Sequence, residues 1–431
     1  MNVAVMGAGY VGLTTAACLA HLGHDVTCAD IDADRVARLR KGEVPILEDR
    51  LPELVAEGIA SKRLQFVVGA SVAAAIAEFV FLCVPTPLGE DGAADMSYVE
   101  AVSREIAPVL RPGTVVINKS TVPVGSTRLV QRVLSESGAP TDGVSVASNP
   151  EFLREGHAVH DFLNPNRIVV GCDDPESAVR VSSLYASVEA PMLVTDPASA
   201  EMIKYASNAF LATKISFINA IANLCEAVDA DVSQVAVGMG YDTRIGSQFL
   251  HPGPGYGGSC FPKDTAALLH RARSVGYDFQ LLEGVMDVNE AQYERMVDKV
   301  RRAAGGALDS AVVAVWGLTF KANTDDLRDS PAVTIIERIL AEGATVRAYD
   351  PAAGDKAARM LPAVDVCADA YEAATGADVV ILLTEWEDFR HLEFDRVHEV
   401  MRGSSLVDSR NLLDSAALRR HGFDYEGVGR R

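Results

Sequence analysis

Short apolar runs alternate with helical stretches along the first part of the chain. Residues 2–6 are mostly apolar and predict a buried strand, and after a glycine-rich turn residues 14–22 predict a helix. Strands that alternate with helices predict a mostly parallel sheet covered by helices on both faces. Further strands are expected at 24–30, 78–84, 114–118, 144–147 and 167–171.

From about residue 199 to residue 237 this pattern gives way to helical spacing. Apolar side chains recur there on one face, which predicts one long helix or two joined helices. These side chains are Ile203, Phe210, Ile215, Ile218, Ile221 and Leu224. A loop dense in glycine and proline then covers 246–264, and helices are expected at 265–274 and 280–302.

The first pattern returns after Gly305 and Gly306. Strands are expected at 311–316, 345–350, 377–384 and 404–407, and a helix at 331–342. The predicted fold class is therefore α/β, with two doubly wound, Rossmann-like domains joined by a central helical region. The expected boundaries are 1–198 for the first domain, 199–303 for the connector and 304–431 for the second domain.

Composition narrows the class of protein. Of the 431 residues, 48% are hydrophobic and 23% are charged, so the chain can form several cores and disorder of the whole chain is excluded. The 59 acidic and 39 basic residues give a formal net charge of −20 at pH 7. Because a negative surface repels phosphate backbones, nucleic acid is not an expected partner.

One uncharged stretch, 3–22, resembles a signal peptide or a membrane span. It lacks a basic start and contains patterned glycines, so a strand, a turn and a buried helix explain it better, and no membrane partner is expected. The seven cysteines are odd in number and form no C-x-x-C pair or Cys/His cluster. Neither a disulfide framework nor a metal site is expected, and free thiols indicate the cytoplasm.

The glycines of the first turn carry the first chemical signal. Gly7, Gly9 and Gly12 form a G-x-G-x-x-G pattern after a predicted strand and before a predicted helix. Gly7 permits the tight turn, Gly9 lets the backbone approach a pyrophosphate, and Gly12 lets helix and strand pack closely. Asp30 ends the next strand, where a carboxylate accepts hydrogen bonds from a ribose and repels a 2′-phosphate. NAD is therefore the expected cofactor.

The corresponding turn of the second half, residues 317–328, lacks this glycine pattern and is a poor dinucleotide cradle. It offers Lys321 and Arg328 at the carboxyl end of a strand, the edge where ligands of such sheets bind. The residues leave two alternatives open, a second phosphate-bearing ligand and a solvated loop.

A third segment, from Gly255 to Asp264, reads Gly-Tyr-Gly-Gly-Ser-Cys-Phe-Pro-Lys-Asp. Its glycines make a loop that can wrap closely around a ligand. Cys260 lies before a predicted helix and near Lys263, and because both features favour thiolate over thiol, a nucleophile is predicted. The alternative is a small buried apolar side chain, which is expected of the other cysteines. These are Cys18, Cys28, Cys83, Cys172, Cys225 and Cys367.

Three polar residues are ambiguous. Lys204 and Asn208 lie on one face of a predicted helix, where an ammonium and an amide can stabilise an oxyanion and hold a water. Glu151 follows a predicted strand and is a candidate general base. From spacing alone, solvated surface side chains are the favoured interpretation of all three.

Six segments in this order resemble those of the nucleotide-sugar 6-dehydrogenases, the UDP-glucose/GDP-mannose dehydrogenase family, over essentially the whole chain. They are 7–12, 119–125, 149–156, 201–210, 249–264 and 320–331. The loop around Cys260 resembles the branch that acts on UDP-glucose. The branches that act on GDP-mannose and on UDP-N-acetylmannosamine are the near alternatives.

The resemblance implies oxidation of UDP-glucose at C6 to UDP-glucuronate, a precursor for polysaccharide biosynthesis, with two NAD reduced per sugar. Cys260 would form a thiohemiacetal and then a thioester, which water hydrolyses. Lys204 and Asn208 would stabilise the oxyanion, and Asp264 would help to orient Lys204 and a water. Thr121 and Glu151 would hold or activate the water, and Glu151 is the favoured base.

The resemblance also implies binding residues and an assembly. The NAD contacts would be Gly7, Gly9, Tyr10, Val11, Gly12, Asp30, Arg35, Thr86, Thr121, Glu155, Lys263 and Arg328. The UDP-sugar contacts would be Glu151, Phe152, Leu153, Lys204, Asn208, Arg244, Phe249, Gly257, Phe320, Lys321 and Arg410. Arg244 would reach the sugar site of the neighbouring subunit, which implies a homodimer. One departure is His251, which stands where the family often has another basic residue.

Two rival functions are considered, and the second belongs to another class of protein. An ordinary two-electron dehydrogenase of a hydroxyacid or a sugar phosphate needs the NAD turn but no thiol, so its turnover would survive replacement of Cys260. A nucleotide-sensing protein would bind NAD or a nucleotide sugar and produce no NADH. The sensing protein is disfavoured because one chain contains five candidate catalytic residues together, namely Cys260, Lys204, Asn208, Asp264 and Glu151.

Overall fold

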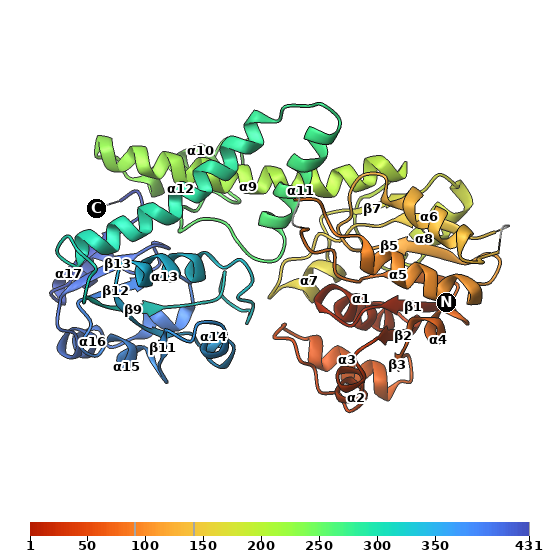
Figure 1. Ribbon diagram of the computed structural model, residues 1–431, viewed down its shortest axis with the longest axis horizontal. Coiled ribbons are helices and arrows are strands. Elements are labelled where there is room, and N and C mark those ends of the chain that lie inside the picture. Colours follow the sequence, from red (N-terminus) through yellow and green to blue (C-terminus); the bar gives the residue numbers. More distant parts are fainter. Residues whose placement is uncertain (90–91, 141–142, 431) are drawn as a thin grey trace. The chain divides into compact units, whose positions relative to one another are not determined.

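The computed structural model describes residues 1–89, 92–140 and 143–430. They form two compact units, each built around one sheet (Figure 1). The first unit contains 1–207 and 266–275, and the second contains 208–265 and 276–431. Helices α9 (Pro197–Val228) and α11 (Phe261–Ser274) contribute residues to both units. The division into three domains at 198/199 and 303/304 stays a prediction.

The sheet of the first unit has eight strands in the order β3-β2-β1-β4-β5-β6-β7-β8. Strands β3 to β6 pair in parallel, β7 meets β6 in antiparallel orientation, and β8 pairs in parallel with β7. The bounds are β1 (Asn2–Met6), β2 (Asp25–Asp30), β3 (Leu64–Val68), β4 (Phe79–Leu82), β5 (Val115–Asn118), β6 (Ser145–Ser148), β7 (Ile168–Gly171) and β8 (Met192–Thr195).

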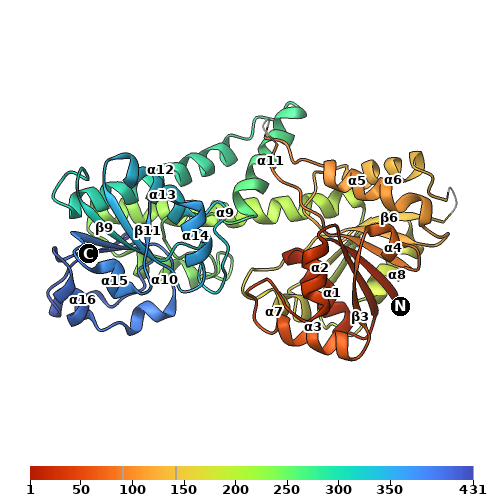
Figure 2. The ribbon, with the colours of Figure 1, turned by 60° about the horizontal axis from the view of Figure 1, so that its bottom comes forward.

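Helices cover both faces of this sheet because its central strands are apolar on both sides. Val3 and Val5 of β1 face one core, and Ala4 and Met6 face the other. Helices α1, α2, α3, α7 and α8 pack on the first face, and α4, α5 and α6 pack on the second (Figure 2). The bounds are α1 (Tyr10–His21), α2 (Ala33–Arg40), α3 (Leu51–Ala60), α4 (Ala70–Ala74), α5 (Ser97–Ile106), η1 (Ala107–Val109), α6 (Ser126–Glu136), α7 (Ala158–Leu163) and α8 (Pro175–Ser183).

The second unit repeats this plan with six parallel strands in the order β11-β10-β9-β12-β13-β14. Val313 and Val315 face the helices α9, α10, α12 and α13, whereas Ala314 and Trp316 face α15, α16 and α17. The strands are β9 (Val312–Trp316), β10 (Thr345–Tyr349), β11 (Asp365–Val366), β12 (Val379–Leu382), β13 (Ser405–Asp408) and β14 (Asp424–Gly427). The helices are α10 (Val232–Gly240), α12 (Gln280–Ala303), α13 (Pro331–Ala341), α14 (Gly354–Met360), α15 (Ala370–Ala374), η2 (Glu387–His391), α16 (Phe394–Val400) and α17 (Ser415–Arg420).

The predicted fold class is confirmed, and every predicted strand is present. The central apolar stretch forms two helices, α9 and α10, which separate at Asp229, a residue with a positive φ of 63°. Four strands were not predicted, namely β3, β8, β11 and β14. They lie at or next to sheet edges, where fewer side chains are buried and the apolar signal is weaker, as in the largely exposed β8.

Helix α9 was overlooked as an apolar segment of membrane-spanning length. It has 32 residues and a mean hydropathy of 1.2 over its most apolar window. Its polar residues Lys204, Asn208, Ser216 and Asn219 are buried in the folded chain. These side chains form hydrogen bonds on the packed side of the helix, while only 33% of its most apolar window is buried. The stretch 3–22 forms β1, the glycine turn and α1, as predicted.

Candidate active site

The glycine turn after β1 is built by close approaches of the chain to itself. Gly7 has a φ of 98°, and a Cβ there would lie 2.8 Å from the carbonyl oxygen of Cys83. A Cβ on Gly12 would lie 1.9 Å from the carbonyl oxygen of Gly7, so helix α1 packs against the turn only with glycine there. Gly9 has no atom within 4 Å of its Cβ position. The turn therefore leaves open space in front of the first amide groups of α1, which fits a pyrophosphate.

Asp30 lies at the carboxyl end of β2 and faces this turn. Its carboxylate accepts hydrogen bonds from the backbone N–H of Ala8 (2.8 Å) and of Asp32 (2.9 Å). The Arg35 guanidinium lies 3.1 Å from the same carboxylate. A carboxylate held in this way fits the ribose hydroxyls of NAD, and a 2′-phosphate would meet its negative charge.

Two threonines continue the carboxyl edge of the sheet. Thr86 follows β4, and its hydroxyl donates a hydrogen bond to the carbonyl oxygen of Thr121, which follows β5 (2.9 Å). Both side chains are buried. Because β4 and β5 are the next strands after β1, the structure brings these residues to the same edge as the glycine turn. Glu155, on the loop after β6, is partly exposed.

Lys204 and Glu151 form a buried ion pair in the first unit. The Lys204 ammonium lies 2.8 Å from the Glu151 carboxylate, and each side chain is only 5% exposed. The backbone N–H of Leu153 also donates to Glu151 (2.6 Å). Burial alone raises the pKa of Glu151, but the Lys204 ammonium and this hydrogen bond outweigh it, so the pKa lies below its ordinary value. The surface interpretation of these two residues was wrong.

Two cationic side chains also pack against the Phe152 ring in the loop after β6. The Arg167 guanidinium lies 3.7 Å from the centre of the Phe152 ring, and the Lys204 ammonium lies 5.5 Å from the same ring. Arg167 also donates a hydrogen bond to the hydroxyl of Ser207 on α9 (3.3 Å). Sequence reasoning missed Arg167, because only the folded chain shows the aromatic ring beneath it.

Two buried glutamates that sequence reasoning also missed anchor the neighbouring segments. Glu48 accepts hydrogen bonds from the Tyr10 hydroxyl and from the backbone N–H of Gly156 and Ala158, so it ties the start of α1 to the loop after β6. Glu201 on α9 accepts from the backbone N–H of Gly125 (2.6 Å) and from Thr127, which fixes the loop after β5 to α9. Both contacts join segments far apart in sequence, and no local pattern signals them.

Cys260 opens helix α11 in the second unit. It precedes Phe261, the first residue of α11, and its carbonyl oxygen accepts the backbone N–H of Asp264 (2.8 Å). Its thiol lies 3.6 Å from the Ser259 hydroxyl. All seven cysteines are free; six are buried, as predicted for them, and Cys260 alone is partly exposed. A partly exposed thiol at a helix N-terminus is favourably placed to ionise.

Two predicted site residues, Asn208 and Lys263, contact the buried carboxylate of Asp264. It accepts a hydrogen bond from the Asn208 side-chain amide (2.6 Å) and forms an ion pair with the neighbouring Lys263. The side chain of Asp264 is fully buried, and Asn208 is 6% exposed. Asn208 is therefore not a solvated surface residue. The proposed action of Asp264 on Lys204 stays a prediction.

The glycines before Cys260 allow close packing within the second unit. A Cβ on Gly257 would lie 2.1 Å from the carbonyl oxygen of Asp329, and one on Gly258 would lie 2.7 Å from the Phe320 ring. These glycines let the chain pack against residues 320–331 of the same unit. That the loop also wraps closely around a ligand stays a prediction. Phe249, with a φ of 62°, lies beside the Phe261 ring at 6.3 Å.

Three predicted UDP-sugar residues of the second unit lie close together. Arg410 donates hydrogen bonds to the carbonyl oxygens of Leu383 (2.8 Å) and Phe320 (2.9 Å), and Lys321 lies 5.4 Å from the Phe320 ring. These contacts assemble Phe320, Lys321 and Arg410 at the carboxyl edge of the second sheet. Arg244, also a predicted UDP-sugar contact, is exposed and pairs with Asp242. Arg328, a predicted NAD contact, is likewise exposed and pairs with Asp326.

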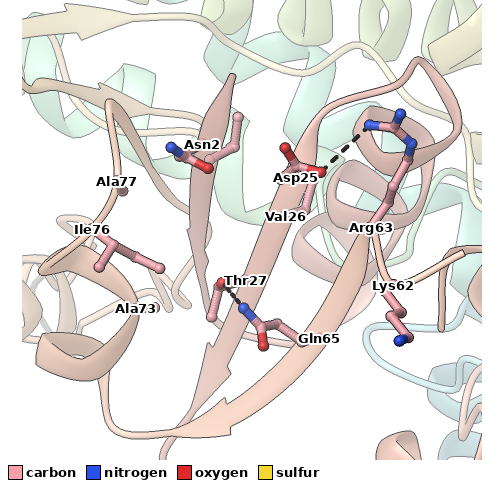
Figure 3. Close-up of a pocket in the computed structure, with 11 residues that line it drawn as sticks. Asn2, Asp25, Val26, Thr27, Lys62, Arg63, Gln65, Ala73, Ile76 and Ala77 are labelled. Carbon is pink, nitrogen blue, oxygen red and sulfur yellow. Dashed lines mark hydrogen bonds and ion pairs between the residues drawn. The ribbon is translucent and has the colours of Figure 1, made fainter.

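The pocket in Figure 3 is not part of these sites. It lies at the amino ends of β1, β2 and β3, opposite the edge that carries the glycine turn, and is lined by Asn2, Asp25, Thr27, Arg63 and Gln65 among others. Its volume of about 40 Å³ is too small for a nucleotide. Across 1–89, 92–140 and 143–430, no three His, Cys, Asp or Glu side chains are grouped to hold a metal ion.

Comparisons with known proteins identify the family. The NAD-binding, central and UDP-binding domains of the UDP-glucose/GDP-mannose dehydrogenase family match residues 1–189, 198–291 and 314–415. A UDP-glucose 6-dehydrogenase of Rhizobium meliloti is 47% identical, and the alignment covers 100% of both chains. The chain belongs to the UDP-glucose/GDP-mannose dehydrogenase family.

Other members of the UDP-glucose/GDP-mannose dehydrogenase family agree. A UDP-glucose 6-dehydrogenase of Bacillus subtilis is 45% identical over 100% of this chain and 98% of its own. The structure of a UDP-glucose dehydrogenase from Pyrobaculum islandicum matches with a TM-score of 0.93 and 39% identity, covering 100% of this chain and 98% of that one. The protein is therefore an NAD-dependent dehydrogenase with a UDP-sugar substrate, as predicted.

Proposed function

We propose that the protein oxidises UDP-glucose at C6 to UDP-glucuronate, reducing two NAD per sugar. The observation that carries this proposal is Cys260, the partly exposed thiol at the N-terminus of α11. An alcohol can lose one hydride without a nucleophile, but oxidation beyond the aldehyde requires addition to its carbonyl carbon. The UDP-glucose 6-dehydrogenases from Rhizobium meliloti and Bacillus subtilis support this choice of sugar.

The first oxidation converts the C6 alcohol into an aldehyde, with loss of one hydride and one proton. NAD, when bound, accepts the hydride in each of the two oxidations. The Cys260 thiolate then forms a C–S bond to the aldehyde carbon, and the carbonyl oxygen becomes the oxyanion of a thiohemiacetal. The ammonium of Lys204 and the amide of Asn208 stabilise this oxyanion by charge and hydrogen bonding. Loss of the second hydride leaves a thioester.

Hydrolysis of the thioester releases the acid and the free thiol. Glu151 is the base in this step, because a carboxylate with a lowered pKa is ionised at neutral pH and can accept a proton from water. Thr121 helps to hold this water, and Asp264 orients the groups around it. The water oxygen bonds to the acyl carbon as the C–S bond breaks, and the thiolate leaves.

We assign the binding residues in the same way. The open turn at Gly9, with Tyr10 and Val11, takes the pyrophosphate of NAD, and Asp30 and Arg35 face its ribose. Further NAD contacts are Thr86, Thr121, Glu155, Lys263 and Arg328. The UDP-sugar contacts are Phe152, Leu153, Phe249, Gly257, Phe320, Lys321 and Arg410.

We also propose a homodimer that forms through the central helices. Phe210, Phe217 and Leu224 on α9 are 64%, 49% and 56% exposed and follow one another at intervals of seven residues, so they form one apolar stripe. Arg244 is 87% exposed and is placed to serve a neighbouring subunit. The seven free thiols support a cytoplasmic location.

The decisive experiment counts NADH formed per UDP-glucose consumed, with NAD in excess and sugar limiting. We expect about two, and loss of turnover in Cys260→Ala but not in the matched Cys225→Ala, which removes a buried thiol elsewhere. A ratio of about one NADH per UDP-glucose would mean that the reaction stops at the aldehyde. No NADH, followed by turnover of GDP-mannose or UDP-N-acetylmannosamine, would change the substrate. Binding without any turnover would favour a sensing protein.

Mixing two inactive variants tests the role of Arg244. If Arg244 serves the partner's site, a mixed dimer of Arg244→Ala and Cys260→Ala protomers contains one complete site and regains activity. If it serves its own site, every site in the mixture lacks one group and activity stays absent. Sedimentation of each variant checks that the dimer has formed.

A further inference from the structure

Lys119 is a buried cation to which the proposed reaction assigns no role. It directly follows β5, and its side chain is 5% exposed. Its ammonium donates hydrogen bonds to the Asn149 amide oxygen (3.0 Å) and the Tyr185 hydroxyl (3.5 Å). It also lies 5.7 Å from the ring centres of Phe162 and Tyr185. Within the described residues, both of its hydrogen-bond partners are uncharged.

Such a lysine costs stability. Burial is the largest effect on the pKa of Lys119, and the nearby Lys204 ammonium acts in the same direction. The interactions with Cys83 and Glu151 act in the opposite direction, and the net pKa is about 8. Replacing a buried charge by an apolar group of similar size is often neutral or stabilising. A strongly perturbed buried lysine beside candidate catalytic residues therefore points to a functional role.

The contacts of Lys119 fix the start of the loop that carries Glu151. Asn149 also accepts a hydrogen bond from Tyr185 (2.6 Å) and donates one to the carbonyl oxygen of Val169 (2.7 Å). Glu151 lies two residues further along. The positive charge of Lys119 is close enough to Glu151 to lower the pKa of its carboxyl group.

We propose that Lys119 is a positioning residue for the reaction, which holds the Glu151 loop through Asn149 and keeps Glu151 ionised while it accepts the proton from water. The inference rests on the proposed function, in which Lys204 stabilises the oxyanion. When the Lys204 ammonium interacts with the oxyanion, it stabilises the negative charge of Glu151 less. A second cation at a fixed position then keeps Glu151 in its ionised form. Lys119 supplies that charge without touching the substrate.

Among the described residues, the ionisable groups near Lys119 and Glu151 come from four segments of the first unit. Lys119 faces Cys83 after β4, Glu151 after β6, Lys204 on α9 and Tyr185 after α8. Burial raises the pKa of the Cys83 thiol to about 12 and that of Tyr185 above its ordinary range, so both stay neutral near pH 7. Of the groups that face Lys119, Glu151 is therefore the one whose ionisation the acidic limb of the activity profile reports.

The test measures the pH dependence of kcat for UDP-glucose oxidation in Lys119→Met and Lys119→Gln. Removal of the positive charge raises the pKa of Glu151, so we expect the acidic limb to move up by about one pH unit in both variants. At neutral pH, kcat falls about tenfold or more. The Kd for NAD changes less than about twofold, and the melting temperature of Lys119→Met is not lowered.

Two controls separate charge from structure. Tyr185→Phe removes a hydrogen bond to Asn149 and leaves the charge, so its acidic limb stays at the wild-type position. Lys299→Met removes another buried lysine, which pairs with Glu226 and Glu426 in the second unit, and also leaves the limb in place.

The outcomes distinguish this inference from the proposed function. An unmoved acidic limb in both Lys119 variants, with wild-type turnover intact, would overturn the inference alone. Failure of both variants to fold would also overturn it, because Lys119 would then be a structural requirement. A wild-type protein that oxidises no nucleotide sugar would overturn the proposed function and this inference together.

Discussion

The first turns of the two sheets share a backbone geometry and differ in what occupies them. Gly7 and Gly317 both have a positive φ, 98° and 88°. Their backbone N–H groups donate to the carbonyl oxygens of Ala29 (2.7 Å) and Tyr349 (2.8 Å), the equivalent positions of the next strands. The same turn geometry therefore recurs after β1 and after β9.

Two side chains make the difference. No atom lies within 4 Å of the Cβ position of Gly9. Its counterpart Thr319 is fully buried, and the Thr319 hydroxyl donates a hydrogen bond to Asp350 (3.2 Å). Asp30 accepts from two backbone groups and one arginine, and its counterpart Asp350 is saturated by the chain itself. The donors to Asp350 are the backbone N–H groups of Leu318, Thr319, Ala352 and Ala353, the Thr319 hydroxyl and the Trp386 indole N–H. One turn is a cradle and the other is closed by its own side chains.

Removal of the Asp350 carboxylate should have the largest effect. We expect Asp350→Ala to lower the free energy of unfolding by about 3–5 kcal/mol, because its buried donors lose a charged acceptor. Both tryptophans, Trp316 and Trp386, lie in the second unit, so their fluorescence during urea unfolding reports that unit. Asp30→Ala, followed by circular dichroism, should cost about 1 kcal/mol. Equal losses would remove the distinction between the two carboxylates.

The buried lysines extend the comparison to pH. Lys299 pairs with two glutamates, but Lys119 has uncharged partners and a pKa of about 8, against 10.5 in an exposed lysine. Between these values the unfolded chain binds more protons than the folded one, so stability rises with pH. We expect wild type to gain about 3 kcal/mol relative to Lys119→Met from about pH 8 to about pH 10.5. If the difference in unfolding free energy between wild type and Lys119→Met stays constant over this pH range, the lowered pKa of Lys119 is contradicted.

A threonine in the first turn should close it as the second is closed. We expect Gly9→Thr to weaken NAD binding at least about a hundredfold, or about 2.7 kcal/mol, because the side chain occupies the space for the pyrophosphate. The unfolding free energy should change by less than about 0.5 kcal/mol, since Thr and Gly are similar N-caps. Calorimetric titration measures the affinity. The reverse change, Thr319→Gly, should create no second NAD site, because Asp350 stays saturated.

The smallest effect concerns the choice of cofactor. Asp30→Ser removes a ribose acceptor and frees Arg35, so we expect NAD binding to weaken about tenfold and NADP binding to strengthen. Adding Arg35→Ala should abolish the gain for NADP. Unchanged discrimination in Asp30→Ser would show that another group excludes the 2′-phosphate.

The sequence alone predicted the features that depend on short segments. The turn at Gly7–Gly12, Asp30 and the exceptional thiol at Cys260 are each recognisable within a few residues, because strand, glycine and helix signals are local. The two-sided apolar strands likewise predicted the doubly wound fold. The edge strands β3 and β8 were missed because their partial exposure weakens the same signal.

Only the tertiary structure decided which polar residues are buried away from solvent. Lys204, Asn208 and Glu151 have the spacing of surface side chains, and their burial follows from partners brought close by folding, Asp264 for Asn208 and the ion pair for the other two. Glu48, Glu201 and Lys119 carry no local pattern, since their contacts join distant segments. A charge becomes chemically useful through the partners and the solvent around it, and both are fixed only when the strands and helices pack.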